Sequence, residues 1–181
     1  YEAGLTGKGP DDVDYDAAEA TTITFADGAS KTSANQGVTI EGDTVTITAP
    51  GTYVLSGTLS DGQVVVDSDA EGKVRLVLDG ASVTNTGGSA LVVTAADEAV
   101  IVLADGSTNS LTDGTGYDTS ADDAPNAAVF SMADLTIGGS GSLTVTGNTN
   151  DGIASKDGLV ILGGTITVTA ADDGVRGKDY L

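Results

Sequence analysis

The sequence DGIASKD at residues 151–157 returns as DGVRGKD at residues 173–179, and a looser version, NAAVFSMAD, precedes both at residues 126–134. Close to them, GSLTVT at residues 141–146 matches GTITVT at residues 164–169. Successive versions lie about 22–24 residues apart, which is the length of one three-sided coil of a β-solenoid. A repeat of this length predicts that the chain winds, so that residues distant in the sequence form columns of neighbours.

Short strand patterns separated by glycine turns run along the chain from residue 21. Polar and apolar residues alternate in VTI at residues 38–40 and TVTIT at residues 44–48, as they do in half-buried strands. Asp-Gly and Gly-Gly pairs mark the turns, and no segment has a helical apolar period over ten residues. A β-sandwich has no reason to repeat its strands at a fixed interval. The sequence therefore predicts an all-β protein, a parallel β-helix with coils of about 22–26 residues.

Two parts of the chain differ in character. Residues 1–20 are polar and rich in Asp and Gly, which predicts an extended or partly disordered lead-in. Residues 21–181 carry the strand patterns and are predicted to form one β-helix domain. Within that domain, residues 112–126 show no strand pattern. Loops of this length are usually functional or disordered, and one at the corner of a coil can cover or build a site.

Acidic residues dominate the charge of the chain, with 27 Asp and Glu against 7 Lys and Arg and a net charge of −20. Such a field repels nucleic acid and anionic membranes and favours divalent cations. Cys and His are both absent, which excludes disulfides, thiolate chemistry and a Ser-His-Asp triad. No stretch is long and apolar enough to span a membrane. Because no start methionine or signal peptide is present, we expect a trimmed, exported protein, secreted or held at the cell surface.

The corner that opens each repeated phrase is rich in oxygen donors. Neighbouring coils would lie about 4.8 Å apart, so Asp123, Asp151 and Asp173 would stack and repel one another. A hard cation between the coils relieves that repulsion, whereas Asp, Asn and Gly at a single corner are ordinary turn formers. Three such corners predict a calcium (Ca2+) site, with candidate ligands Asp122, Asp123, Asn126, Asn148, Asn150, Asp151, Asp172 and Asp173.

A second column is formed by Asp134, Asp157 and Asp179, with lysines beside it. These charges either pair locally on the surface or form a basic stripe next to calcium that grips a carboxylated sugar. The second interpretation predicts a ligand-binding set of Lys156, Asp157, Arg176, Lys178 and Asp179. Thr-x-Thr pairs at 84–86, 144–146 and 167–169 leave open an ice-binding face, although threonine suits any exposed strand.

An ordered series of phrases resembles the secreted bacterial carbohydrate-binding β-helix family, which is related in fold to polysaccharide lyases of the pectate type. The similarity extends over about residues 15–181. It is carried by GTYVLSGTL at 51–59, KVRLVLDG at 73–80, LADGSTNSLTDG at 103–114, the stretch 123–129, NDGI at 150–153, SKD at 155–157 and DGVRGKD at 173–179.

The resemblance implies a right-handed parallel β-helix, calcium at the corners between coils and affinity for acidic polysaccharides such as polygalacturonate. It also implies a binding protein more than an enzyme. In related lyases calcium acidifies the uronate and a lysine or arginine removes the C5 proton, a role open to Lys156, Lys178 or Arg176.

Three functions follow, in order of preference. The first is a secreted, non-catalytic protein that binds acidic polysaccharide through calcium and neighbouring lysines. The second is a self-assembling filament or matrix subunit, because the coil at residues 173–179 would leave an edge for end-to-end stacking of copies. The third is a calcium-dependent polysaccharide lyase.

Overall fold

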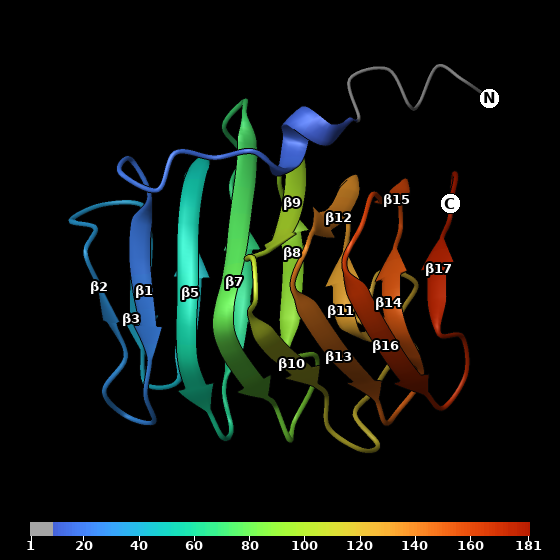
Figure 1. The fold of residues 1–181 in the computed structure, drawn as a ribbon. Helices are drawn as coiled ribbons and strands as arrows, with labels where there is room; N and C mark the ends of the chain where they lie inside the picture. The colour runs from blue at the N-terminus through green and yellow to red at the C-terminus, as the bar shows by residue number, and fades with distance from the viewer. Residues whose placement is uncertain (1–8) are drawn as a thin grey trace.

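The computed structural model describes residues 9–181 and consists of strands, with one short 3-10 helix, η2 (Pro10–Val13). Figure 1 shows the strands standing side by side in two layers along the length of the molecule. The first sheet contains β1 (Thr21–Phe25), β2 (Lys31–Thr32), β5 (Gly51–Leu59), β7 (Lys73–Thr84), β9 (Glu98–Leu103), β10 (Thr108–Thr112), β12 (Leu135–Gly139), β13 (Ser142–Gly147), β15 (Leu159–Ile161) and β16 (Thr165–Ala170).

The second sheet has seven strands in the order β17-β14-β11-β8-β6-β4-β3. These are β3 (Val38–Glu41), β4 (Thr44–Ile47), β6 (Gln63–Asp67), β8 (Leu91–Ala95), β11 (Ala127–Ser131), β14 (Asp151–Ser155) and β17 (Val175–Gly177). From β4 onward each strand pairs in parallel with the next one in this sheet. Residues of the two repeated phrases therefore face one another, as in the pair Ile153 and Val175.

The prediction of a right-handed parallel β-helix with coils of nearly constant length is wrong, because the strands form two mixed sheets. The pairs β1–β2 and β3–β4 are antiparallel. The long strand β7 branches the first sheet, since it pairs with β9 along its first half and with β10 along its second. The interval between neighbouring strands is also irregular, as the positions paired across the second sheet show: Val45, Val64, Leu91, Val129, Ile153 and Val175. A regular interval holds only near the end of the chain, which is where the repeated phrases lie.

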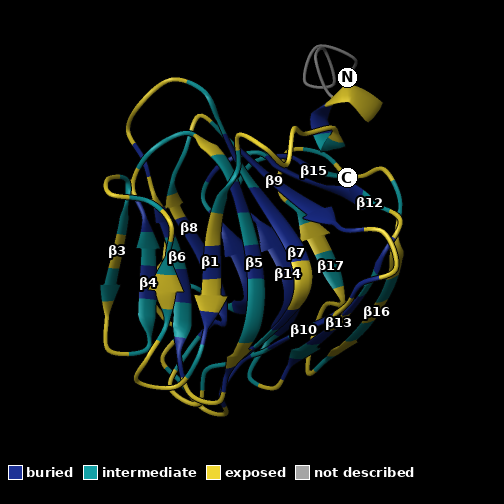
Figure 2. Ribbon diagram, turned by 60° about the vertical axis from the view of Figure 1, so that its left-hand side comes forward, coloured by how far each residue is buried: buried dark blue, intermediate teal, exposed yellow. Residues whose placement is uncertain are grey.

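The core lies between the two sheets and consists of aliphatic side chains in rows. Val64, Leu91, Val129 and Ile153 occupy paired positions, and each is at most 1% exposed. Burying a side chain of this size contributes roughly 1.5–3 kcal/mol. Figure 2 shows the buried residues concentrated in the middle strands, and the exposed ones in the turns and on outer strands such as β1 and β17. Because these rows align successive strands, the turns that follow the strands are aligned as well. Side chains of successive turns are therefore neighbours.

The helix η2 lies against the outer side of the first sheet, where Val13 packs with Val77, Val100 and Val102. Asp12 is only 4% exposed and accepts a hydrogen bond from Lys73, and Arg75 Nε donates to the backbone oxygen of Asp12 at 2.8 Å. Residues 9–20 of the predicted lead-in thus contain a docked helix, and residues 1–8 lie outside the described part of the chain. Within residues 9–181, no helix has the length and apolarity needed to cross a membrane.

Candidate functional site

The repeated phrases place two carboxylates side by side at the start of β14 and just before β17. Gly152 N donates to Asp173 O at 2.9 Å, and Asp173 N donates to Asp151 Oδ1 at 3.2 Å. With Asp172 they form a cluster in which one carboxylate oxygen from each residue lies within 4.8 Å of the others. We call Asp151, Asp172 and Asp173 the three-aspartate site. Three carboxylates at this separation are the ligands that Ca2+ takes in proteins.

Asp151 differs from its two partners because it is fully buried, whereas Asp172 and Asp173 are exposed. Burial raises the pKa of Asp151 above its ordinary value of 3.8, and the charges of Asp173 and Asp172 raise it further. The backbone N–H of Asp173 and the guanidinium of Arg176, 3.9 Å away, oppose that rise. A buried carboxylate whose pKa is raised by other carboxylates gains most from a cation placed among them.

Two asparagines contact the carboxylate of Asp151, one directly before it in the chain and one from the neighbouring turn. Asn150 Nδ2 donates to Asp151 Oδ1 at 3.1 Å, and Asn126 Nδ2 reaches Asp151 Oδ2 at 3.5 Å. Asn126 Oδ1 is buried and has no hydrogen-bond partner within residues 9–181. An amide oxygen in this position is a suitable further ligand for a hard cation, so Asn126 and Asn150 belong with the three-aspartate site.

A pocket of about 140 Å³ opens beside Asp151. Three basic side chains, those of Lys156, Arg176 and Lys178, line it together with Asn126 and Ser155. Lys156 Nζ donates to the backbone oxygen of Asp122 at 2.8 Å and so joins the pocket to the 112–126 segment. We call this the basic pocket. The carboxylates that can bind a metal ion thus lie next to basic side chains that can bind a carboxylate.

The structure distributes the remaining predicted metal ligands elsewhere. Asp122 and Asp123 are exposed and lie outside the three-aspartate cluster. The register pairs Ala127 with Asp151, which places Asn126 rather than Asp123 beside that carboxylate. Asn148 is turned toward another residue, because its Nδ2 donates to Asp113 O at 2.9 Å. The stack of Asp123, Asp151 and Asp173 is therefore replaced by Asp151 and Asp173 with Asp172.

Two members of the predicted ligand-binding set lie outside the basic pocket. Asp157 lines a different pocket, and burial followed by the charges of Asp134 and Asp179 raises its pKa. Asp179 N donates to the backbone oxygen of Asp157 at 3.2 Å. The structure thus divides the predicted set into three basic residues beside the three-aspartate site and two acidic residues away from it.

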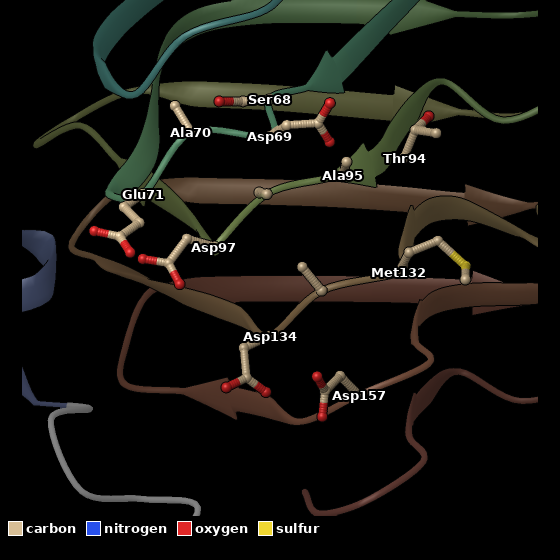
Figure 3. A pocket seen from close by; sticks show the side chains of 12 residues that line it. Ser68, Asp69, Ala70, Glu71, Thr94, Ala95, Asp97, Met132, Asp134 and Asp157 are labelled. Atoms are coloured by element: carbon tan, nitrogen blue, oxygen red, sulfur yellow. The ribbon is translucent and has the colours of Figure 1, made fainter.

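Sequence reasoning missed most of the partners of Asp157. Asp69, Glu71 and Asp97 line the same pocket, with Asp134 (Figure 3), and we call it the acidic pocket. Each lies in a turn between a strand of the second sheet and the next strand of the first sheet, as Asp157 does. An acidic residue in each of these equivalent turns was the sequence signal that could have predicted this pocket. The interval in this part of the chain is not constant, as the paired positions Val64, Leu91 and Val129 show, so it does not appear as a repeat.

Comparison with known proteins identifies the family of this chain. The family described as "Carbohydrate-binding domain-containing protein" matches residues 41–181. The chain belongs to this family.

Two relatives are informative. A carbohydrate-binding domain-containing protein of Acetivibrio thermocellus is 42% identical over 136 residues, which make up 74% of this chain and 48% of that protein. The chain therefore spans about half the length of that relative. A solved structure, the polysaccharide lyase-like protein from C. thermocellum as a gadolinium derivative, is similar with a TM-score of 0.79 and 40% identity. That similarity covers 83% of this chain and 62% of the other.

Proposed function

We propose that this chain is an exported, non-catalytic module that binds an acidic polysaccharide of the polygalacturonate type through calcium. The observation that carries the proposal is the contact between two opposite groups of charges. Three carboxylates offer oxygens within 4.8 Å of one another, and three basic side chains line the pocket that Asp151 shares. The family membership supports a carbohydrate as the ligand.

Calcium resolves an electrostatic difficulty of this proposal. The chain has a net charge of −20, so a polyuronate approaching it is repelled over the whole surface. A divalent ion at the three-aspartate site neutralises that cluster locally and keeps open positions for sugar carboxylate and hydroxyl oxygens. The gadolinium derivative of the polysaccharide lyase-like neighbour fits this view, because lanthanide ions take the same hard oxygen ligands.

The basic pocket supplies the second half of the recognition. Arg176 presents a planar guanidinium that binds a carboxylate through two parallel hydrogen bonds, and Lys156 and Lys178 add point charges. Arg176 and Lys178 are exposed, so a sugar reaches them without a rearrangement of the core. A uronate bound here bridges calcium and Arg176. Secretion suits this mechanism, because extracellular calcium modules bind with dissociation constants of roughly 10⁻⁴–10⁻³ M.

Titration calorimetry with polygalacturonate tests the mechanism. Binding is expected with calcium and is expected to disappear in excess chelator. The double variant D172N/D173N should lose binding while E71Q/D97N, which also removes two carboxylate charges, should retain it. Undiminished affinity in chelator would show that the sugar is not held through calcium.

A lyase is the second candidate, because the solved neighbour is called polysaccharide lyase-like. In such a reaction a basic residue of the pocket would remove the C5 proton of a uronate, the C4–C5 double bond would form as the C4–O bond breaks, and the leaving oxygen would take up a proton. Calcium held by the three-aspartate site would make the C5 proton more acidic. Lys156, Arg176 and Lys178 line the pocket beside the three-aspartate site and are the available bases. Absorbance of unsaturated uronate ends, formed from polygalacturonate with calcium and lost in K156A or R176A, would favour the lyase over the binding module.

A further inference from the structure

The chain between β10 and β11, residues 113–126, joins the two halves of the proposed uronate site. Its last residue, Asn126, contacts the carboxylate of Asp151, and the backbone oxygen of Asp122 accepts a hydrogen bond from Lys156 Nζ at 2.8 Å. We call residues 113–126 the connecting segment. Because Lys156 lines the basic pocket, the position of this segment affects a side chain that is proposed to bind the sugar.

A buried carboxylate fixes the beginning of the connecting segment. Asp113 is only 2% exposed, and its two oxygens accept hydrogen bonds from the backbone N–H of Asn148 and from Tyr117 Oη, the latter at 2.7 Å. A carboxylate taken out of water loses its hydration, so it needs such bonds to retain its charge. Asp113 therefore joins the segment, through Tyr117, to the turn before β14, through Asn148.

The same turn holds the first residues of the segment by their backbone. Thr149 Oγ1 donates to Gly114 O at 2.7 Å and accepts a hydrogen bond from Gly116 N at 2.8 Å. Gly114 also approaches the neighbouring turn so closely that a Cβ added there would lie 2.1 Å from Thr86 O. The beginning of the connecting segment is therefore packed on both sides.

Beyond Tyr117 the segment has fewer contacts with the rest of the protein. Residues 118–125 are mostly exposed. Within the described part of the chain their hydrogen bonds are local, apart from the one that Asp122 O accepts from Lys156. Tyr117 is therefore the last anchor before the stretch that contacts Lys156.

The hydroxyl of Tyr117 remains a hydrogen-bond donor at neutral pH. Burial raises its pKa above the ordinary value of 10.0, the hydrogen bond to Asp113 raises it further, and the charge of Asp151 adds to the rise. The bond between Tyr117 and Asp113 is therefore present under the conditions in which the sugar is expected to bind.

A fixed Lys156 favours binding of a carboxylate. Its ammonium group has three N–H donors, so the bond to Asp122 O leaves two for the ligand. The bond also restricts a long side chain before the ligand arrives, which reduces the entropy lost on binding. Asn126, a proposed calcium ligand, is held in a different way, because Asp151 N donates to its backbone oxygen at 2.9 Å.

We propose that Tyr117 is a positioning residue of the basic pocket: its bond to Asp113 places residues 118–125 so that Asp122 O holds Lys156 in the orientation that receives a uronate. The proposal rests on the proposed function for the identity of the ligand. It adds that sugar affinity, but not calcium affinity, depends on a hydroxyl that acts through Lys156.

Titration calorimetry of Tyr117→Phe tests the proposal. In the presence of calcium the variant should bind polygalacturonate about fivefold more weakly than the parent, and it should bind calcium alone as the parent does. Combined with Lys156→Ala it should cause no further loss, because the lysine through which it acts is gone. Tyr53→Phe is the matched control, since it removes a hydroxyl that donates to Ala49 O at 2.7 Å outside the basic pocket, and it should bind the sugar as the parent does.

A second measurement needs no sugar. Acylation of the lysines by an amine-reactive ester, followed by peptide mass spectrometry, should find that Lys156 reacts more slowly than the exposed Lys178. Tyr117→Phe should raise the rate at Lys156, and Tyr53→Phe should not. If this result is obtained while the parent protein binds no polygalacturonate, the proposed function fails and the positioning of Lys156 by Tyr117 stands.

Three results would overturn the proposal. The first is a parallel loss of calcium and sugar affinity in Tyr117→Phe, which would indicate a general structural role. The second is an additive effect of Tyr117→Phe and Lys156→Ala on sugar affinity. The third is an acylation rate of Lys156 that Tyr117→Phe leaves unchanged.

Discussion

The three-aspartate site and the acidic pocket are both lined by carboxylates from successive turns, but they differ in spacing and in charge balance. At the first, three oxygens lie within 4.8 Å of one another and basic side chains lie alongside. At the second, five carboxylates surround about 390 Å³ with an apolar floor. Close spacing of carboxylates favours a bound ion. Acidic turns on one scaffold thus form two sites that differ in geometry.

The largest expected effect is on calcium affinity. D172N/D173N removes two of the three carboxylates and should weaken calcium binding about a hundredfold, or roughly 2.7 kcal/mol, in titration calorimetry. Both side chains are exposed, so the fold should remain intact. E71Q/D97N is the matched control from the acidic pocket. Equal losses in the two variants would mean that net charge, and not the geometry of the three-aspartate site, governs calcium affinity.

Calcium should also stabilise the fold, because Asp151 is buried among like charges. At a free calcium concentration of 100 times the dissociation constant, the free energy of unfolding should rise by about 2.7 kcal/mol, measured by denaturant titration. D172N/D173N should remove most of this increase. An increase that survives in this variant would place the stabilising ion elsewhere in the molecule.

The origin of the two sites in the sequence explains which one was predictable. Asp151 and Asp173 belong to the two matching phrases, and the register of Ile153 with Val175 turns the interval between the phrases into a direct contact of neighbouring strands. Asp123 does not stack on Asp151, because Ala127 is the residue that pairs with Asp151. The intervals between the earlier strands differ from one another, so nothing in the spacing connected Asp97 with Asp157.

The same difference explains the error in the fold. A regular interval near the end of the chain was extended to the whole chain, although the antiparallel pairs lie near its beginning. The long strand β7 carries no sequence mark that it will pair with both β9 and β10. Branching of this kind depends on which partners the long strand meets in three dimensions. Local alternation of polar and apolar residues predicts the strand but not its partners.

A smaller effect separates the two halves of the proposed uronate site. Arg176→Ala should weaken polygalacturonate binding about tenfold, because it removes a guanidinium that forms two hydrogen bonds with the sugar carboxylate. Calcium binding alone should be unchanged or slightly stronger. The guanidinium of Arg176 lies 3.9 Å from the carboxylate of Asp151, and its positive charge repels a calcium ion bound there. Arg176→Lys should recover part of the sugar affinity without the planar geometry. A parallel loss of calcium and sugar affinity would show instead that Arg176 supports the fold of the site.

The smallest effect is a pH dependence that belongs to the three-aspartate site. The pKa of Asp151 is raised above 3.8 in the folded chain by burial and by Asp173 and Asp172, so protons compete with calcium at a higher pH than at an ordinary carboxylate site. Without calcium, an acid with a raised folded pKa favours folding fully below 3.8, and this contribution is lost as the pH rises through the folded pKa. Calcium binds the ionised form and offsets that loss.

The calcium-induced rise in unfolding temperature should therefore be full at neutral pH and should shrink as the pH falls through the folded pKa of Asp151. Thermal unfolding with and without calcium across this range measures it. Asp151→Asn should flatten the dependence, because the replacement has no proton to exchange, whereas Asp97→Asn should leave it in place. A dependence that Asp151→Asn does not alter would assign the titrating group to another carboxylate and would remove the buried aspartate from the calcium mechanism.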